Sequence, residues 1–341
     1  MKRYSILIFL ILILGCKKPF SQTPETALAL PIEFTEQTES IVFIAGFDEG
    51  DNTYYTNAKH YFEAQDIQVV DHLFSIEEII SFLNKTAGKT YDKIHIVSHS
   101  NPWLGMSLKT TRKGERITVE TLSEFKNDIP ILKSGVNNTT QIVFHSCGLG
   151  ENKVLLQALK QVFTTVESPK IIASSYFNVF GGKYAGHYLA KPYYGYYPTA
   201  ESPGPAALSK DFKASYPQTK IDWFTALKTR KETSLGGIYS YKFNIPVEWE
   251  FTFNDKAEIP ELSDRDAIMD WVSESSEMAT ILYHLNIPIE KYRWKSEIRG
   301  NKLLIKGKTT VLCVLQPILQ KDDATEYRNT AINDTSLYQT I

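Results

Sequence analysis

The sequence is poor in cysteine and in net charge. Its 341 residues include three cysteines, Cys16, Cys147 and Cys313, which are too few for a disulfide framework, so each is interpreted from its own surroundings. The formal net charge of −2 gives no electrostatic reason to expect nucleic acid as a partner. The sequence also lacks internal repeats and any apolar run long enough to span a bilayer. The chain is nevertheless long enough to form a sizeable core in one or two domains.

The first apolar segment ends at a cysteine. Lys2 and Arg3 precede the apolar stretch Ile6–Leu14, which is followed by Gly15 and Cys16. A basic head before a short apolar stretch is typical of a signal peptide, and its ending resembles a bacterial lipobox, in which cleavage precedes a cysteine that is then acylated. We therefore expect a lipoprotein signal peptide at 1–15, a tether at 16–40, and a bilayer anchor of the bacterial cell envelope at Cys16. An ordinary secretory signal with an incidental cysteine is the alternative.

Residues 41–205 are predicted to form an α/β domain. Apolar runs typical of buried strands occur at 41–47, 67–70, 93–97, 141–144 and 170–176, and helical patterns separate most of them. This alternation predicts a mainly parallel sheet with helices on both faces.

The rest of the chain follows a different pattern. Between Phe243 and Phe253 the odd positions are apolar and the even positions mostly polar, which indicates a strand covered on one face. A helix is expected from Ser263 or Asp264 to about Leu285, followed by strands at 292–298, 302–305 and 309–315. We expect a smaller α+β domain at 206–320 and a loose polar tail at 321–341. Cys313, within an apolar strand, is expected to be a buried inert thiol.

Two strands of the first domain end in groups that can carry out chemistry. The run Lys93–Val97 is followed by His99, and the run ending at Phe144 is followed by Cys147 and two glycines. Open α/β sheets place their sites at the carboxyl ends of strands. If these strands are neighbours, an imidazole lies beside a thiol, as a cysteine nucleophile requires.

These two strand ends resemble the caspase–hemoglobinase group of cysteine peptidases, which includes metacaspases, clostripain and gingipain. His99 precedes Cys147 by 48 positions, and the caspase histidine precedes its cysteine by about 50. The resemblance covers roughly residues 41–176. It implies a caspase-like fold, Cys147 as nucleophile, His99 as the proton-transfer residue, and an oxyanion hole formed by the backbone N–H groups of Ser100 and Cys147. It also implies a peptide or protein substrate, and neither a metal nor an organic cofactor for the reaction.

The same resemblance suggests a specificity pocket. Members that select basic residues keep two acids, one after the first strand and one two residues before the cysteine. In this sequence Asp48 occupies the first position and His145 the second. With only one acid kept, we expect at most a modest preference for arginine or lysine before the cut bond. Ser100 also departs from the group, which has glycine there.

Other interpretations remain open. Cys147 is also consistent with a small core residue, His99 with a satisfied polar side chain, and Asp48 with a solvated loop acid. The segment Ile94–Ser100 resembles the nucleophile elbow of an α/β-hydrolase with Ser100 as nucleophile, although both elbow glycines are missing. A non-catalytic caspase-like lipoprotein that binds a partner or a glycan is the third possibility.

The anchor can be tested directly. Cys16→Ala should abolish incorporation of labelled fatty acid and leave uncleaved precursor, because the acylated thiol no longer exists. Metabolic labelling followed by mass spectrometry of the amino terminus provides the measurement. Fully soluble wild-type protein with a free amino terminus beyond Cys16 would contradict the prediction.

Overall fold

The computed structural model describes residues 39–48, 52–86, 88–321 and 324–341. The predicted signal peptide, Cys16 and the tether up to position 38 lie outside these residues. Within the described part of the chain, no helix combines the length and the apolar character needed to cross a membrane.

The first sheet is mainly parallel, as the sequence predicts. Its strands run in the order β2-β1-β3-β6-β7-β13, and all neighbours are parallel except β13, which pairs antiparallel with β7. Their bounds are β1 (Ser40–Ala45), β2 (Gln68–Leu73), β3 (Lys93–Val97), β6 (Gln141–His145), β7 (Lys170–Ser174) and β13 (Tyr338–Thr340). The strand order reverses between β1 and β3, where open α/β sheets bind their ligands.

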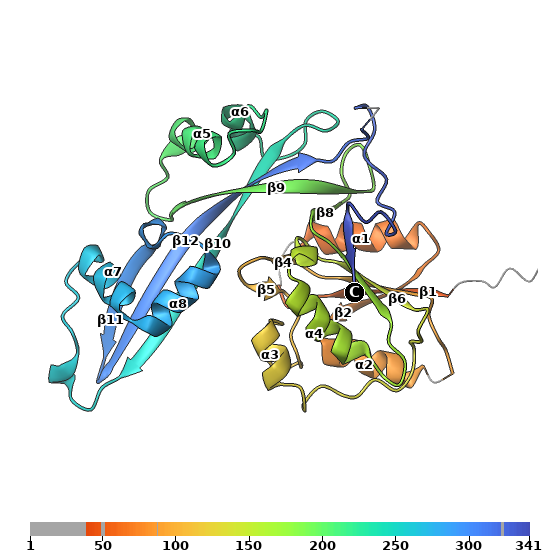
Figure 1. The fold of residues 1–341 in the computed structure, drawn as a ribbon, viewed down its shortest axis with the longest axis horizontal. Helices are drawn as coiled ribbons and strands as arrows, with labels where there is room; N and C mark the ends of the chain where they lie inside the picture. The colour runs from red at the N-terminus through yellow and green to blue at the C-terminus, as the bar shows by residue number, and fades with distance from the viewer. Residues whose placement is uncertain (1–38, 49–51, 87, 322–323) are drawn as a thin grey trace, which may run out of the picture. The chain divides into compact units, whose positions relative to one another are not determined.

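Helices cover both faces of this sheet (Figure 1). One face packs on α2 (Ile76–Lys85), α3 (Val119–Glu124) and α4 (Lys153–Phe163), and the other on α1 (Thr53–Glu63). Helix α2 begins with a capping box, because Ser75 accepts from the Glu78 N–H and the Glu78 carboxylate accepts from the Ser75 N–H.

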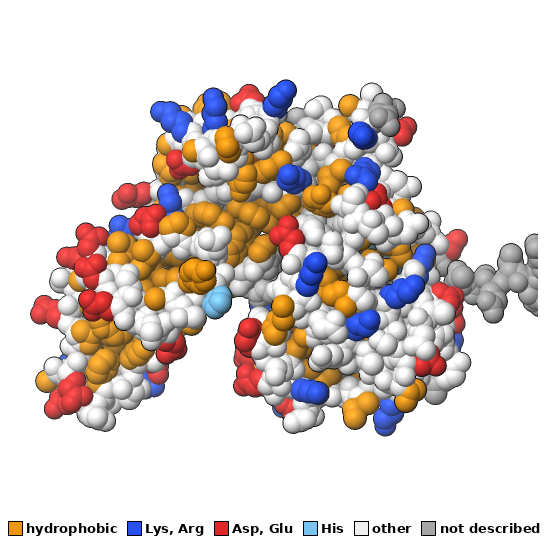
Figure 2. Space-filling view, in the orientation of Figure 1, with side chains coloured by type: hydrophobic (Ala, Val, Ile, Leu, Met, Phe, Trp, Pro, Cys, Tyr) orange, Lys and Arg blue, Asp and Glu red, His pale blue; other side chains and the backbone are white. Residues whose placement is uncertain are grey.

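The second sheet is antiparallel and has long strands. Its order is β10-β12-β9-β8, and β11 also pairs with β12. In Figure 2 hydrophobic side chains gather over the part of the molecule where Figure 1 shows β9, β10 and β12. Helices α5 and α6 pack on β9 and β12, and α7 and α8 pack on β10, β11 and β12. The bounds are β8 (Phe177–Phe180), β9 (His187–Pro198), α5 (Gly204–Ser215), α6 (Trp223–Lys228), β10 (Tyr239–Thr252), α7 (Arg265–Glu274), α8 (Ser276–Leu285), β11 (Arg293–Arg299) and β12 (Lys302–Pro317), with short 3-10 turns at Lys256–Glu258 and Ile289–Lys291.

Two predicted elements differ in extent. Residues 302–317 form one strand where two were expected, because Gly307 continues the strand beneath the Trp294 ring, where a Cβ atom would lie 2.5 Å from a ring carbon. The long helix expected up to Leu285 is two helices, because Ser275 between them is extended, with φ −78° and ψ 113°. Asp264 caps the first, accepting from the Ala267 N–H.

The chain does not change sheets at position 205. Strands β8 and β9, which precede it, already belong to the second sheet. The segment predicted as a loose tail returns to the first sheet, where β13 pairs with β7. There Leu337 and Tyr338 are buried against Val143, Ile172 and Leu189. The polar composition of residues 321–341 gave no indication that Leu337 and Tyr338 are buried.

This packing predicts that the C-terminal segment stabilises the fold. Leu337→Ala should lower the free energy of unfolding by about 2–5 kcal/mol, because it leaves a cavity in a buried cluster. Gln339→Ala, at a partly exposed neighbouring position of β13, is the matched control and should change it by less than about 0.5 kcal/mol. Urea unfolding measures both. Equal, negligible effects would mean that the segment is a tail after all.

Candidate active site

His99 and Cys147 lie at the ends of adjacent parallel strands. In the β3–β6 ladder Val97 pairs with His145, so each candidate residue follows its strand by the same two positions. The Ser100 hydroxyl donates a hydrogen bond of 2.6 Å to the Cys147 carbonyl oxygen and ties the two strand ends together. The two strands are therefore neighbours, which is the condition on which the interpretation of His99 and Cys147 depends.

The imidazole of His99 is held by residues from the loop after β1 and from α1. Its Nε2 lies 3.0 Å from the Asn52 amide oxygen and 3.9 Å from a carboxylate oxygen of Asp48. The ring stacks on Tyr54 at 4.4 Å between centroids, and the His99 backbone N–H donates to the Tyr55 hydroxyl. The sequence analysis missed Asn52, Tyr54 and Tyr55, although they follow the acidic loop closely.

This arrangement favours neutral His99 with a free nitrogen. Because the Asn52 oxygen accepts, we assign the ring proton to Nε2. Among the described residues Nδ1 has no hydrogen-bond partner, and 34% of the side chain is exposed. Burial lowers the His99 pKa, and the Asp48 charge opposes this only in part. His99 can therefore accept a proton at neutral pH.

The thiol of Cys147 is buried and protonated. The residue is 8% exposed and packs in a cluster with Phe177, Tyr188 and Cys313. Its thiol donates to the Asn178 carbonyl oxygen at 3.8 Å, and burial raises its pKa to about 12. Within the described part of the chain, no hydrogen bond joins this thiol to His99. The two residues follow adjacent strands, but their side chains bond to different partners.

The two backbone groups expected to form an oxyanion hole are available. In the short ladder between β4 (Ser100–Asn101) and β5 (Gly105–Met106), Ser107 donates to the His99 carbonyl and Met106 donates to Ile117. Ser100 therefore sits at a non-hydrogen-bonded pair, and its N–H points away from β5. No described residue accepts a hydrogen bond from the Cys147 N–H. Both residues line one cavity of about 530 Å³.

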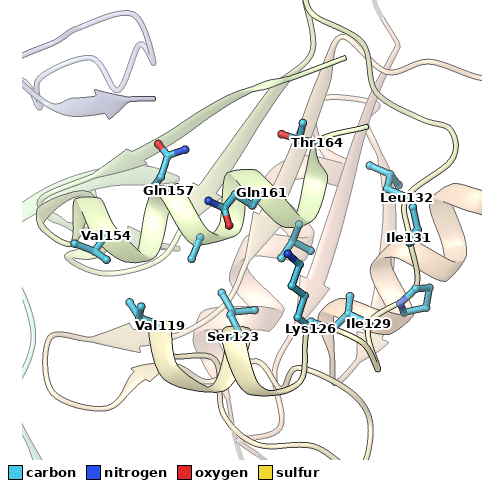
Figure 3. Close-up of a pocket in the computed structure, with 14 residues that line it drawn as sticks. Val119, Ser123, Lys126, Ile129, Ile131, Leu132, Val154, Gln157, Gln161 and Thr164 are labelled. Atoms are coloured by element: carbon cyan, nitrogen blue, oxygen red, sulfur yellow. The ribbon is translucent and has the colours of Figure 1, made fainter. Parts of the chain in front are cut away.

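A larger cavity, of about 740 Å³, lies between α3 and α4 (Figure 3). Apolar side chains such as Val119 and Val154 border it, with Lys126 and Gln161 among its polar groups. It contains none of the candidate site residues. Size alone therefore does not indicate the site.

The structure does not bring Asp48 and His145 together in one pocket. Asp48 accepts a hydrogen bond of 2.8 Å from the Tyr55 hydroxyl and faces His99. His145 is 4% exposed and packs against Phe62 and Phe180. Asp48 orients His99, and His145 belongs to the core.

His145 is part of a buried histidine cluster, which we define as His95, His145 and His187. His95 Nδ1 and His145 Nε2 are 2.9 Å apart, and His187 Nε2 lies 3.1 Å from the Asn178 amide oxygen. Burial lowers the pKa of all three, that of His145 to about 4. Asn178 thus contacts both this cluster and the Cys147 thiol.

The remaining expectations for this region concern Cys313 and metals. Cys313 is fully buried in β12, as predicted, and burial raises its pKa. Across the described ranges, no group of three or more histidine, cysteine, aspartate or glutamate side chains is arranged to hold a metal ion.

Comparison with known proteins identifies no family for this chain. No protein-family model matches the chain, and no curated protein matches it significantly.

The histidine cluster predicts a loss of stability in acid. Folding lowers the pKa of His145 from 6.5 to about 4, so the unfolded chain binds this proton first as the pH falls. The free energy of unfolding should therefore decrease from about pH 6.5 to about pH 4, by about 3 kcal/mol for His145 alone. His145→Gln should flatten this dependence in urea unfolding at pH 7, 5.5 and 4.5. An identical pH dependence in both proteins would contradict the prediction.

Proposed function

We propose that the protein is a cysteine peptidase of the caspase–hemoglobinase type, anchored in the bacterial cell envelope through acylated Cys16. The observation that carries the proposal is the placement of His99 and Cys147 at adjacent strand ends, beside a cavity lined by Ser100 and Cys147. A base, a nucleophile and two backbone donors that have no acceptor among the described residues are the parts that acyl transfer requires.

The reaction begins with a movement of the thiol. Cys147 turns from the Asn178 carbonyl oxygen toward the cavity, and its proton passes to Nδ1 of His99. The sulfur attacks the peptide carbonyl carbon and forms the C–S bond. The N–H groups of Ser100 and Cys147 then stabilise the resulting oxyanion.

His99 completes the cycle. It returns the proton to the departing amine as the C–N bond breaks, which leaves a thioester on Cys147. It next takes a proton from a water molecule that attacks this thioester. As the C–S bond breaks, His99 returns that proton to the sulfur, which restores the thiol and releases the acid. Asn52 and Asp48 act as positioning residues for His99 throughout. The chemistry calls for no cofactor.

One observation favours the non-catalytic alternative, a caspase-like lipoprotein that binds a partner or a glycan. The Cys147 thiol has a raised pKa and is bonded away from His99. Ser100 offers less support for the α/β-hydrolase alternative, because its hydroxyl is already bonded to the Cys147 carbonyl oxygen.

Peptidase activity should depend on both strand ends. Cys147→Ala and His99→Ala should each lower kcat/KM at least about a thousandfold, and the double variant should lose little more, because the two residues act as one unit. A peptide library supplies the substrate. A peptidyl acyloxymethyl ketone should label Cys147 of the wild type.

Cys313→Ala is the matched control and should keep both activity and labelling. Activity that survives in Cys147→Ala would refute the proposal. A folded wild type with neither activity nor labelling would favour the non-catalytic alternative.

A further inference from the structure

A helix from the second half of the chain forms one wall of the cavity beside Cys147. The loop after β3, the start of α3 and the start of α4 form three of its walls, and α8 forms the fourth. Its volume of about 530 Å³ falls within the usual range for small-ligand sites.

One face of α8 is assigned to this cavity. Ile281, His284 and Leu285 follow the spacing that places side chains on one side of a helix. Met278 and Leu282 are buried in the core beneath β10 and β12 and anchor the helix. Ile281 is 38% exposed, so its side chain is open to an occupant.

The lining is mostly apolar and nearly uncharged. Trp103, Val119, Leu149, Leu155 and Ile281 are among its apolar groups, and it includes neither lysine nor arginine. Glu120 carries its one carboxylate. An acidic side chain would find neither lysine nor arginine here. Glu120 is exposed to solvent, which weakens its attraction for a basic side chain, whereas a large apolar side chain would be removed from water.

Asp48, the acid expected to select basic residues, already interacts with other side chains of the protein. Asp48 is bonded to the Tyr55 hydroxyl and faces His99. The nearby Arg116 guanidinium interacts with it electrostatically. Neither Asp48 nor His145 lines the cavity beside Cys147.

We infer that this cavity binds the side chain of the residue that supplies the scissile carbonyl, and that it selects large apolar residues such as leucine and phenylalanine. The inference rests on the proposed peptidase function. It replaces the expected modest preference for arginine or lysine, because Cys147 and Ser100, which would hold the carbonyl, line this cavity and no other described here.

Binding to a variant that cannot react tests the inference apart from catalysis. Cys147→Ala would be titrated by calorimetry with four acetylated tripeptide amides, Ala-Ala-X, in which X is phenylalanine, leucine, arginine or glutamate. The phenylalanine and leucine peptides should bind at least about tenfold more tightly than the other two, a ratio typical of an apolar pocket.

A charge placed on the cavity face of α8 should reverse this order. Ile281→Glu, added to Cys147→Ala, should weaken binding of the phenylalanine peptide at least about fivefold and strengthen binding of the arginine peptide. Tyr283→Glu is the matched control, since Tyr283 is 81% exposed on the same helix and is not among the lining residues. His284→Glu serves as a second cavity variant, and thermal unfolding verifies that each variant is folded.

Equal affinity for the four peptides, a preference for arginine, or the same response to Ile281→Glu and Tyr283→Glu would overturn the inference. These outcomes are independent of whether Cys147 reacts. A failure of the proposed function appears instead in the activity and labelling of the wild type.

Discussion

The hydrogen-bonded ladder between β3 and β6 is the constraint on which the rest of the site depends. Because the two strands are parallel and in register, their carboxyl ends stop at the same level, and His99 and Cys147 follow at equal distances. Side chains alternate along a strand, so the ladder also presents His95 and His145 to the opposite face from Ile94 and Ile142. One pairing therefore creates both the candidate active site and the buried histidine cluster beneath it.

Asn178 connects these two features from the second sheet. Its carbonyl oxygen accepts the hydrogen bond from the Cys147 thiol, and its amide oxygen contacts His187. Burial in an apolar cluster keeps the thiol protonated, and the hydrogen bond to Asn178 directs it away from His99. His99, by contrast, is already oriented by Asn52 and Asp48. For the proposed reaction, His99 is thus already oriented, whereas the Cys147 thiol would first have to turn away from Asn178.

The second sheet thus acquires a role in the site that its composition does not indicate. Strand β8 supplies Asn178, and α8 supplies a wall of the cavity beside Cys147. The C-terminal segment joins the two sheets further, since β13 adds an antiparallel edge strand to the first sheet and Leu337 and Tyr338 pack with Leu189 of β9. The residues from Glu39 onward accordingly behave as one unit, and the division expected near position 205 separates neither the packing nor the site.

The sequence by itself determined the local features: the buried parallel strands, the capping box at Ser75, the alternation of β10 and the placement of His99 and Cys147 at strand ends. Each depends on periodicity or on residues a few positions apart, which a sequence displays directly. Only the tertiary structure decided which side chains face these two residues. Asn52, Tyr54 and Asn178 contact the candidate site residues, whereas His145 is buried in the core. Contacts between distant segments determine these side-chain environments, and a sequence does not display such contacts. For the same reason Asp48 faces His99, and Ile281 of a distant helix borders the cavity.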